Sequence, residues 1–462
     1  MSQTPFSTLK LKPGLLKNLS TLGYEGMTPI QEQSLPHILK GSDVIAQGKT
    51  GSGKTAAFGL GLLENLDVKR FRIQTLVLCP TRELADQVAK EIRRLARGIH
   101  NIKVLTLCGG VSIGPQIGSL EHGAHIIVGT PGRVDDHLRK GTLRLDDINT
   151  FVLDEADRML EMGFQEAVED IVDLIQGPRQ TLLFSATFPE AIKSIARRIM
   201  VNPVMVKVDA KHDEESIKQH FYKVTGNEQR LTAVQLLLLH HRPESSVIFC
   251  NTKKETQEVA DDLHDVGFSV MALHGDLDQR DRDQTLIRFA NKSISILVAT
   301  DVAARGLDID SLDAVINYHI AHDPEIHIHR IGRTGRAGSK GMAYSLISDK
   351  ESHKVINLGN YLDRVIEGEP LPDESLLESP IFEPTMATLQ IEGGKKQKVR
   401  PGDILGGLTG EKGIEGKQVG KINVFDNWAY VAVDRKAVQK ALKKLSQGGL
   451  KGRSFRVRFI RD

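Results

Sequence analysis

The sequence predicts two tandem α/β domains, each built on a doubly wound parallel sheet, followed by a small basic α+β domain. Short apolar runs rich in β-branched residues alternate with longer amphipathic stretches in two successive blocks, as strands and crossover helices do in such sheets. Residues 395–462 hold 17 Lys and Arg against six Asp and Glu, a net charge of +11, whereas the whole chain carries +2. The preceding 394 residues therefore carry −9, and a basic module follows an acidic body. Strand-like alternation within the basic segment favours a polyanion-binding domain over a solvated tail.

Composition also predicts where the domains divide. The polar segment 210–216 separates the two blocks and is interpreted as a linker. Residues 365–394 contain seven acidic residues, four prolines and neither Lys nor Arg, which disfavours a packed core and indicates an extended connector. The predicted parts are an N-terminal domain, a linker, a second domain, a connector and a basic domain, at residues 1–209, 210–216, 217–364, 365–394 and 395–462.

Cysteine usage and hydropathy exclude several classes of protein. Cys79, Cys108 and Cys250 are far apart, and each ends an apolar run, so buried reduced thiols are favoured over zinc ligands or disulfides. No apolar run approaches the ~18 residues that span a bilayer. The N-terminus lacks the apolar stretch of a signal peptide. We expect a cytoplasmic monomer with no membrane contact.

A phosphate-binding loop is predicted at residues 48–55. The sequence GKTGSGKT fits G-x-x-x-x-G-K-[ST], and it lies between the apolar strand 43–47 and a helix-like run. Glycines let backbone N–H groups surround phosphates, Lys54 can reach the β- and γ-phosphates, and the Thr55 hydroxyl can bind Mg²⁺. The candidate ATP-binding residues of this loop are Gly48, Thr50, Gly51, Ser52, Gly53, Lys54 and Thr55.

Carboxylates follow the apolar strand 150–153. Residues 154–157 read Asp-Glu-Ala-Asp, at the edge of the sheet where the phosphate loop is also expected. Alone, such a tetrapeptide is usually a solvated turn, but beside a phosphate loop a catalytic role is favoured. Asp154 suits Mg²⁺ and Glu155 suits the attacking water.

The second block has no phosphate loop, but it carries closely spaced arginines. Residues 329–336 read HRIGRTGR. If the two α/β domains close face to face, Arg333 and Arg336 can stabilise charge on the γ-phosphate, an effect worth roughly 10³–10⁵ in rate. The alternative is an exposed basic loop.

With these motifs assembled, the chain resembles the DEAD-box RNA helicases over residues 6–345, and residues 154–157 spell the family's name. The resemblance implies two RecA-like domains that use ATP and Mg²⁺. Residues 28–31 (Thr-Pro-Ile-Gln) resemble the adenine-reading motif of that family. This chain departs from the family just before the motif, where it has Met27 in place of the usual proline. The resemblance implies that Gln31 hydrogen-bonds the adenine edge and that Phe6 packs nearby. It also implies that Ser185 and Thr187 link the ATP state to strand separation, and that Asp301 contacts the ribose.

The resemblance also implies RNA contacts along both α/β domains. These positions combine small residues, hydroxyls and arginines that suit a phosphate–sugar backbone and carry little base information. ATP and RNA together would close the domains and open a duplex locally, so their binding should be reciprocally coupled. The implied RNA-contacting residues are Thr81, Arg82, Gly110, Thr130, Gly132, Arg133, Asn251, Arg282 and Thr300.

The basic domain partly fits an RNA-recognition motif at residues 427–433. Trp428 and Tyr430 alternate along an expected strand, where they stack on RNA or fill the small core. Residues 403–408 are the expected partner strand. RNA binding would rely more on basic residues, among them Lys398, Arg400 and Arg456.

The fusion, with the run GGKKQKVRPGDILG at residues 393–406, resembles one bacterial subfamily of these helicases. That resemblance implies recognition of a hairpin in 23S ribosomal RNA near the peptidyl-transferase centre, during assembly of the large ribosomal subunit. Ribosomal RNA duplexes and assembly intermediates are the expected partners. Composition and spacing indicate only a basic module tethered to an unspecific motor. An ATP-gated RNA clamp or assembly scaffold, with hydrolysis only for release, is the alternative, and a DNA helicase is disfavoured.

Overall fold

The computed structural model describes the chain in segments that form two compact units. One unit comprises residues 1–212 with 306–308, and the other comprises residues 213–305 with 309–462. The predicted linker at 210–216 lies outside the described residues. The structure describes residues 4–48, 51–208, 217–304, 312–335, 341–448, 450 and 452–460.

The first unit is built on a parallel sheet whose described strands follow the order β3-β4-β2-β5-β6-β1-β7. Consecutive residues of each strand face opposite sides, so Ala46 and Val77 join one apolar core while Ile45 and Leu76 join the other. The strands are β1 (Val44–Gln47), β2 (Thr75–Leu78), β3 (Val104–Leu107), β4 (Ile126–Gly129), β5 (Thr150–Asp154), β6 (Gln180–Ser185) and β7 (Val204–Lys207).

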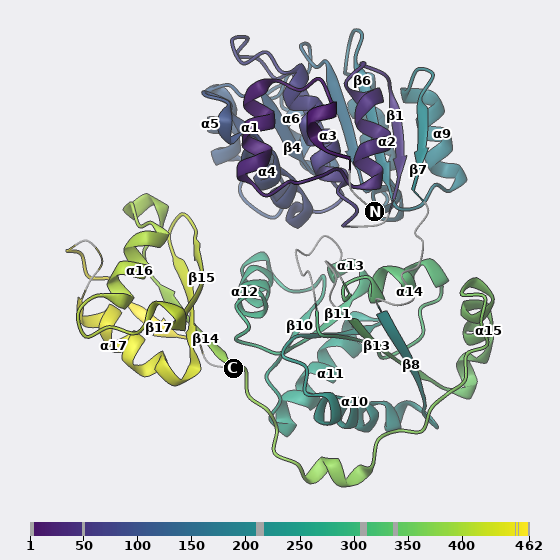
Figure 1. Cartoon of the computed structure of the whole chain (residues 1–462), viewed down its shortest axis with the longest axis vertical. Coiled ribbons are helices and arrows are strands. Elements are labelled where there is room, and N and C mark those ends of the chain that lie inside the picture. Colours follow the sequence, from purple (N-terminus) through teal and green to yellow (C-terminus); the bar gives the residue numbers. More distant parts are fainter. Residues whose placement is uncertain are drawn as a thin grey trace. The chain divides into compact units, whose positions relative to one another are not determined.

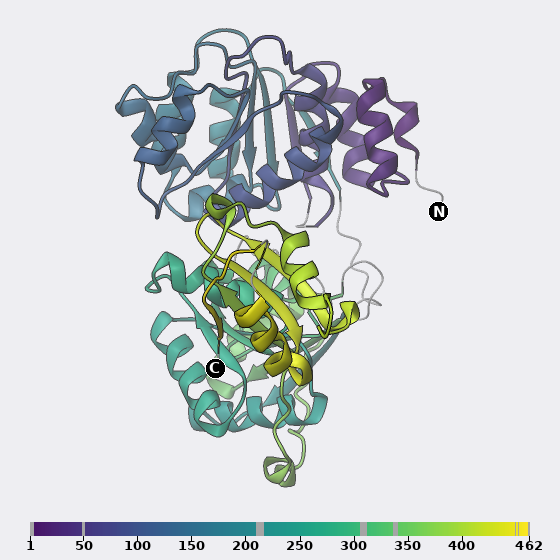
Figure 2. The ribbon, with the colours of Figure 1, turned by 90° about the vertical axis from the view of Figure 1, so that its left-hand side faces the viewer.

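Helices cover both faces of this sheet (Figures 1 and 2). Helices α1 to α4 pack on one face, and α5 to α9 pack on the other. The helices are α1 (Pro13–Thr21), α2 (Pro29–Ile38), α3 (Lys54–Asn65), α4 (Arg82–Leu95), α5 (Gly114–Glu121), α6 (Pro131–Arg139), α7 (Ala156–Glu161), α8 (Gln165–Asp173) and α9 (Glu190–Ile199).

The second unit contains another parallel sheet, in the described order β10-β11-β9-β12-β13-β8. Helices α10 and α11 cover one face, and α15 contributes to a smaller cluster on the other. Its elements are β8 (Ile217–Lys223), α10 (Asn227–His241), β9 (Ser246–Cys250), α11 (Lys253–Val266), β10 (Val270–Leu273), α12 (Gln279–Ala290), β11 (Ile296–Thr300), α13 (Asp301–Ala304), β12 (Ala314–Asn317), α14 (Pro324–Ile331), β13 (Gly341–Ile347) and α15 (Ser352–Tyr361).

The acidic segment after α15 packs on the second sheet domain. Glu369 forms a parallel bridge with Tyr222, its N–H donating to Phe221 O at 2.6 Å and its carbonyl accepting from Lys223 N at 3.1 Å. Phe382 lies 6.0 Å from the Phe268 ring and beneath the Arg242 guanidinium. An extended connector was expected, and its side chains add apolar contacts that composition did not indicate. Those packed against the core are Leu371, Leu376, Ile381 and Phe382.

The C-terminal domain has an antiparallel sheet, in the described order β15-β16-β14-β17, with two helices against it (Figure 1). With it, the predicted fold class of two parallel-sheet domains and a small α+β domain is confirmed. Its elements are β14 (Met386–Ile391), α16 (Pro401–Thr409), β15 (Val419–Val424), β16 (Ala429–Asp434), α17 (Val438–Gly448) and β17 (Val457–Phe459).

The strand expected at residues 403–408 is wrong, because these residues lie in α16. Pro401 takes the first helical position, and the Asp403 carboxylate accepts from Arg400 N at 2.8 Å, which caps the helix. The partner of β16 is β14 instead, which comes from the segment assigned to the connector. The small domain therefore includes residues before 395.

One face of this small sheet is covered by the preceding domain. Thr388 is fully buried although it points away from the core of its own domain. Its hydroxyl accepts from Asn291 Nδ2 at 3.2 Å and lies 2.7 Å from Ser293 Oγ. The Asn291 amide nitrogen and the hydroxyls of Thr388 and Ser293 are therefore hydrogen-bonded where the two domains of this unit meet.

Thr388→Val keeps the shape of the side chain but removes the hydroxyl that Asn291 and Ser293 use. We expect a loss of about 1–3 kcal/mol in the free energy of unfolding, because buried polar groups lose their partner. Denaturant unfolding with amide hydrogen exchange of β14 measures the change. The exposed Thr385→Val is the matched control; equal exchange in both variants would contradict the importance of this contact.

Candidate functional site

The phosphate loop lies at the carboxyl edge of the first sheet. Strand β1 lies beside β6, and β6 lies beside β5, so the loops that follow these three strands meet there. Gly48 N donates to Ser185 O at 3.0 Å. Lys54 begins α3, so the loop and the N-terminus of a helix form one anion-binding turn.

Glycine is required at several places in this loop. Gly51 and Gly53 have φ of 81° and 93°, in the left-handed region that favours glycine. A Cβ on Gly48 would lie 2.7 Å from Ile30 Cδ1, and one on Gly53 would lie 2.5 Å from Gln31 Nε2. A side chain at Gly48 or Gly53 would therefore displace Ile30 or Gln31, so glycine at both positions lets the loop pack closely against α2. Thr50, predicted to bind ATP, lies outside the described residues.

Gln31 supports the phosphate loop in this structure. Its Oε1 accepts from Thr28 N at 2.9 Å, and its Nε2 donates to Gly53 O at 3.1 Å. The Thr28 hydroxyl donates to Ser52 O at 2.7 Å. Phe6 is buried edge-on against Tyr24. The adenine contact of Gln31 and the packing of Phe6 beside it remain predictions.

Lys54 and Asp154 lie buried beside the loop. The Lys54 ammonium donates to Gly48 O at 2.7 Å. Burial raises the pKa of the Asp154 carboxyl to about 7, and the charge of Lys54 partly opposes that rise. A carboxylate whose ionised form is penalised by burial gains from a bound cation.

The residues around the loop fit an ATP–Mg²⁺ complex. Ser52 Oγ is buried and has no hydrogen-bond partner among the described residues, as in a loop shaped to receive a ligand. Thr55 lies in the first turn of α3, where its hydroxyl accompanies Lys54. Hydroxyl and carboxylate oxygens, from Thr55 and Asp154, are the ligands Mg²⁺ prefers.

Glu155 has a strained backbone. Its φ of 53° and ψ of 52° are left-handed, a conformation that costs a non-glycine residue about 1–3 kcal/mol and that clusters at functional sites. The residue is buried, and its N–H donates to Asp154 Oδ1 at 3.1 Å. The turn thus separates two adjacent carboxylates, consistent with a metal ligand and a separate acceptor for water.

Asp157 connects this turn to the residues that follow β6. Asp157 Oδ2 accepts from Thr187 N and Thr187 Oγ1, both at 2.9 Å, and Ser185 Oγ accepts from Asp157 N at 3.3 Å. Burial raises the pKa of Asp157, but the hydrogen bonds from Thr187 and the charge of Lys54 outweigh it and lower the pKa. The coupling residues predicted from sequence are therefore bonded to the acidic turn.

The RNA-contacting residues predicted in the first unit also gather at one edge, after the adjacent strands β3, β4 and β2. Arg82 donates to Gly109 O at 3.4 Å, and Arg133 Nη2 donates to Val111 O at 2.9 Å. Thr81 caps α4 by accepting from Leu84 N. Gly110 follows Gly109, and Thr130 and Gly132 precede Arg133 around the start of α6.

In the second unit, Arg330 holds several predicted residues together. Its guanidinium donates to both Asp301 oxygens at 2.7 and 2.8 Å, and to Asn251 Oδ1 at 3.2 Å. Thr300 ends β11 immediately before Asp301, and Arg282 lies in the first turn of α12. Arg333 is buried just after α14, and Arg336 lies outside the described residues.

Two basic residues of the C-terminal domain are bonded through their backbones to the turn between β15 and β16. Lys395 N and Lys396 N donate to the carbonyls of Phe425 and Asp426. Lys398, Arg400 and Arg456 are exposed, and Arg453 donates to Gln397 O at 3.3 Å. Trp428 is partly exposed in the same turn.

Tyr430 differs from Trp428, because its ring is buried edge-on against Phe425. It lies on the sheet face away from the domain's own core. Arg280 of α12 lies 6.0 Å from the Trp428 ring centroid. RNA stacking on Tyr430 would require this face to be uncovered, whereas Trp428 is partly accessible.

Four residues that hold the loops of the second unit were not predicted from the sequence: Arg330, Glu255, His319 and Glu351. Arg330 stood inside the quoted arginine motif, but its buried fork to Asp301 depends on two segments brought together by folding. Glu255, His319 and Glu351 carried no motif at all. Their only signal was position, since each lies within a few residues of the end of a predicted strand.

Comparisons with known proteins agree with this arrangement. Three family models match: DEAD/DEAH box helicase at residues 28–195, helicase conserved C-terminal domain at 228–338, and DbpA RNA binding domain at 388–459. The chain is 53% identical over 459 residues to the ATP-dependent RNA helicase DbpA of Escherichia coli (strain K12), covering 99% of this chain and 100% of that protein. It is 43% identical to the DEAD-box ATP-dependent RNA helicase CshA of Bacillus subtilis (strain 168), over 80% of this chain and 75% of that one.

Among solved structures, S. cerevisiae Dbp5 bound to RNA and ADP BeF3 matches with a TM-score of 0.72 and 32% identity, covering 81% of this chain and 99% of that chain. In the part of the chain that the structure describes, no helix has the length and apolar character that a bilayer crossing needs. The cysteines Cys79, Cys108 and Cys250 are free and buried, as predicted.

Glu155→Gln removes the proton acceptor but keeps the side chain's size. We expect hydrolysis to fall by roughly 10²-fold or more, because general-base catalysis is lost, while nucleotide binding persists. Steady-state ATPase rates and titration with a fluorescent nucleotide measure the two effects. The exposed Glu166→Gln should leave both unchanged; normal turnover in Glu155→Gln would exclude the assigned role.

Proposed function

Because the chain belongs to the DEAD-box ATP-dependent RNA helicases, we propose that it opens duplexes of 23S ribosomal RNA during assembly of the large ribosomal subunit. Its helicase activity follows from the family, and the target is our proposal. The observation that supports the target is the exposure of three basic residues, Lys398, Arg400 and Arg456, on a domain matched by the DbpA RNA binding model.

We assign the proposed hydrolytic roles to residues of both units. In the first, Lys54 binds the β- and γ-phosphates, Thr55 and Asp154 hold Mg²⁺, and Glu155 orients the attacking water. Mg²⁺ held by Thr55 and Asp154 would offset the negative charge of the phosphates. In the second, Asp301 binds the ribose, while Arg333 and Arg336 stabilise the γ-phosphate in the transition state.

RNA enters this scheme through the loops at the carboxyl edges of both sheets. The hydroxyls, glycines and arginines there suit the sugar–phosphate backbone, so the motor part binds RNA with little regard to base. Selectivity then falls to the C-terminal domain. The packed connector and the buried Thr388 contact tie that domain to the second sheet domain, which supports a short tether and a high local RNA concentration.

The proposed partners are ribosomal RNA hairpins and duplexes within assembly intermediates, met in the cytoplasm by a monomer. The alternative remains an ATP-gated clamp or scaffold that hydrolyses ATP only for release. The presence of Glu155, Arg333 and Arg336 favours turnover, because a static clamp needs no residue to orient the attacking water or to stabilise the transition state.

Arg333→Ala tests the arginine finger. We expect the hydrolysis rate to fall by roughly 10³-fold, the lower end for such fingers, with a much smaller change in ATP affinity. Single-turnover hydrolysis and equilibrium ATP binding separate the two quantities. Equal losses in both would identify Arg333 as a ground-state ligand instead.

The target is tested in the full chain by Lys398→Ala/Arg400→Ala/Arg456→Ala. We expect the ribosomal RNA concentration for half-maximal ATPase to rise about tenfold or more, because tethered binding is lost. An unrelated RNA of equal length should be affected little. The exposed triple variant Lys436→Ala/Lys440→Ala/Lys443→Ala removes the same charge from α17 and its approach and is the matched control. An unchanged preference for ribosomal RNA would assign selectivity to the motor part.

A further inference from the structure

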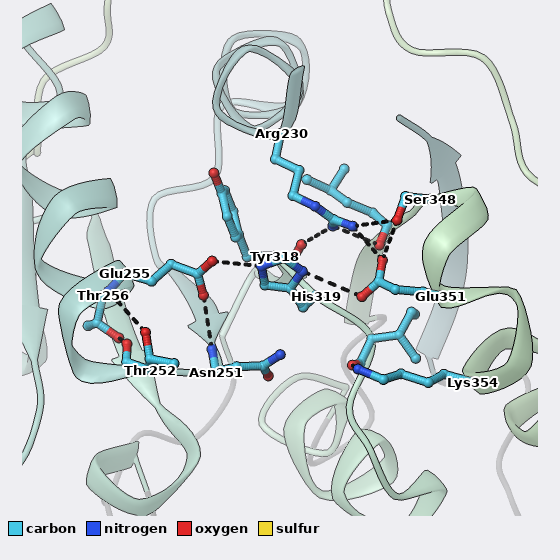
Figure 3. A network of polar contacts seen from close by, with 12 residues as sticks. Arg230, Asn251, Thr252, Glu255, Thr256, Tyr318, His319, Ser348, Glu351 and Lys354 are labelled. Carbon is cyan, nitrogen blue, oxygen red and sulfur yellow. Dashed lines mark hydrogen bonds and ion pairs between the residues drawn. The ribbon is translucent and has the colours of Figure 1, made fainter. Parts of the chain in front are cut away.

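A chain of polar contacts follows the carboxyl edge of the second sheet (Figure 3). The strands β11, β9, β12 and β13 are neighbours in that order. Asp301, Asn251 and His319 come just after the first three, and Glu351 lies four residues past the fourth. Parallel strands therefore bring together four residues that are far apart in sequence.

His319 lies between two carboxylates. Its Nε2 is 2.6 Å from Glu255 Oε1, and its Nδ1 is 3.4 Å from Glu351 Oε1. The side chains of His319 and Glu351 are only 15% and 10% exposed. Glu351 is held in turn by the buried Arg230 and by Ser348 Oγ at 3.0 Å.

The chemistry of these groups indicates the protonation state of the ring. A carboxylate only accepts hydrogen bonds, and a neutral imidazole has a single N–H to donate. Both ring nitrogens of His319 face a carboxylate oxygen. Only the imidazolium can donate on both sides, so the arrangement fits a cation between two anions.

The same ring is bonded to the loops of the candidate site. Glu255 Oε2 accepts from Asn251 N at 3.2 Å, so His319 and Asn251 share one carboxylate. On the other side, Arg330 Nη1 donates to His319 O at 2.9 Å, while its other nitrogens bind Asp301 and Asn251.

We propose that His319 is a positioning residue: as an imidazolium it holds Glu255 and Glu351 together and thereby sets the loops of Asn251 and Asp301 for RNA and nucleotide. This inference rests on the roles proposed for Asn251 and Asp301. It adds to the helicase a residue whose charge state tunes how tightly RNA binding is coupled to hydrolysis.

The charges around the ring determine how this contact depends on pH. Burial lowers the pKa of His319, but the hydrogen bonds to Glu255 and Glu351 outweigh it and raise the pKa above its ordinary 6.5, against the opposing charge of Arg230. The pKa of Glu351 is lowered to about 2. The other groups packed here are the Tyr318 ring, Arg330 through its bond to the backbone, and Lys354, which donates to Ile320 O at 3.4 Å.

These pKa shifts determine how the contributions of His319 and Glu351 to stability change with pH. Because the folded-state pKa of His319 is raised, its contribution to stability is complete below pH 6.5 and is lost as pH rises through the folded value. The Glu351 contribution is present above its ordinary 4.5 and is lost only as pH falls towards about 2. As pH rises from 6.5, His319 is therefore the group of this pair that changes charge.

The test measures RNA-stimulated ATPase of the full chain from about pH 6 to pH 9, where a histidine changes charge. His319→Gln should raise the RNA concentration for half-maximal activity about fivefold at low pH, the lower end of site-to-site coupling, with a smaller change in kcat. The wild type should approach the variant as pH rises. His319→Arg, with a permanent charge, should keep the low-pH value at every pH. His353→Gln, which removes an exposed histidine of α15, is the control.

A pH profile and RNA dependence of His319→Gln equal to those of the control would overturn the inference. Asn251→Ala shows whether a failure lies in the positioning role of His319 or in the RNA contact proposed for Asn251. If Asn251→Ala weakens RNA binding and His319→Gln does not, His319 is only structural. If neither variant changes RNA binding, the role of Asn251 fails, and the positioning role of His319 fails with it.

Discussion

The functional groups of the first two sheet domains depend on one constraint, the common direction of the strands in each parallel sheet. Parallel strands end at the same edge, and the loops that leave them must share that edge. In the first unit this brings Gly48, Ser185 and Asp154 together, although more than a hundred residues separate the first from the others. In the second unit the same rule gathers Asn251 and Asp301 with His319.

Buried charge is tolerated at these edges because each charge has a partner. Asp157 accepts two hydrogen bonds from Thr187, and Arg330 divides its donors among Asp301, Asn251 and a backbone carbonyl. Removing one member of such a set leaves the others unpaired in a poorly solvated place, which costs more than the lost contact itself. The loops are thereby held in one geometry, as a site that must align phosphate and RNA requires.

The C-terminal domain shows how packing can change a role indicated by composition. An acidic, proline-rich segment lacks the residues for its own core, yet it contributes Leu376 and Phe382 to the core of its neighbour. Part of the same segment forms β14, with Thr388 buried beneath Asn291 and Ser293. A segment that composition marks as a spacer is therefore an ordered attachment in this structure.

The sequence by itself determined the features that depend on neighbouring residues of the chain. The phosphate loop and the acidic turn at Asp154 each lie within one strand–loop–helix unit, where glycine conformation and helix polarity need no distant residue. The alternation of apolar runs with amphipathic stretches was sufficient to predict both parallel sheets. Only the tertiary structure decided that residues 403–408 form a helix and that β14 pairs with β16, because strand pairing is settled between segments far apart. Only the tertiary structure also showed that His319 contacts Glu255 and Glu351. His319 and Glu255 are 64 residues apart in sequence, and a contact over that separation produces no periodic pattern in one sequence.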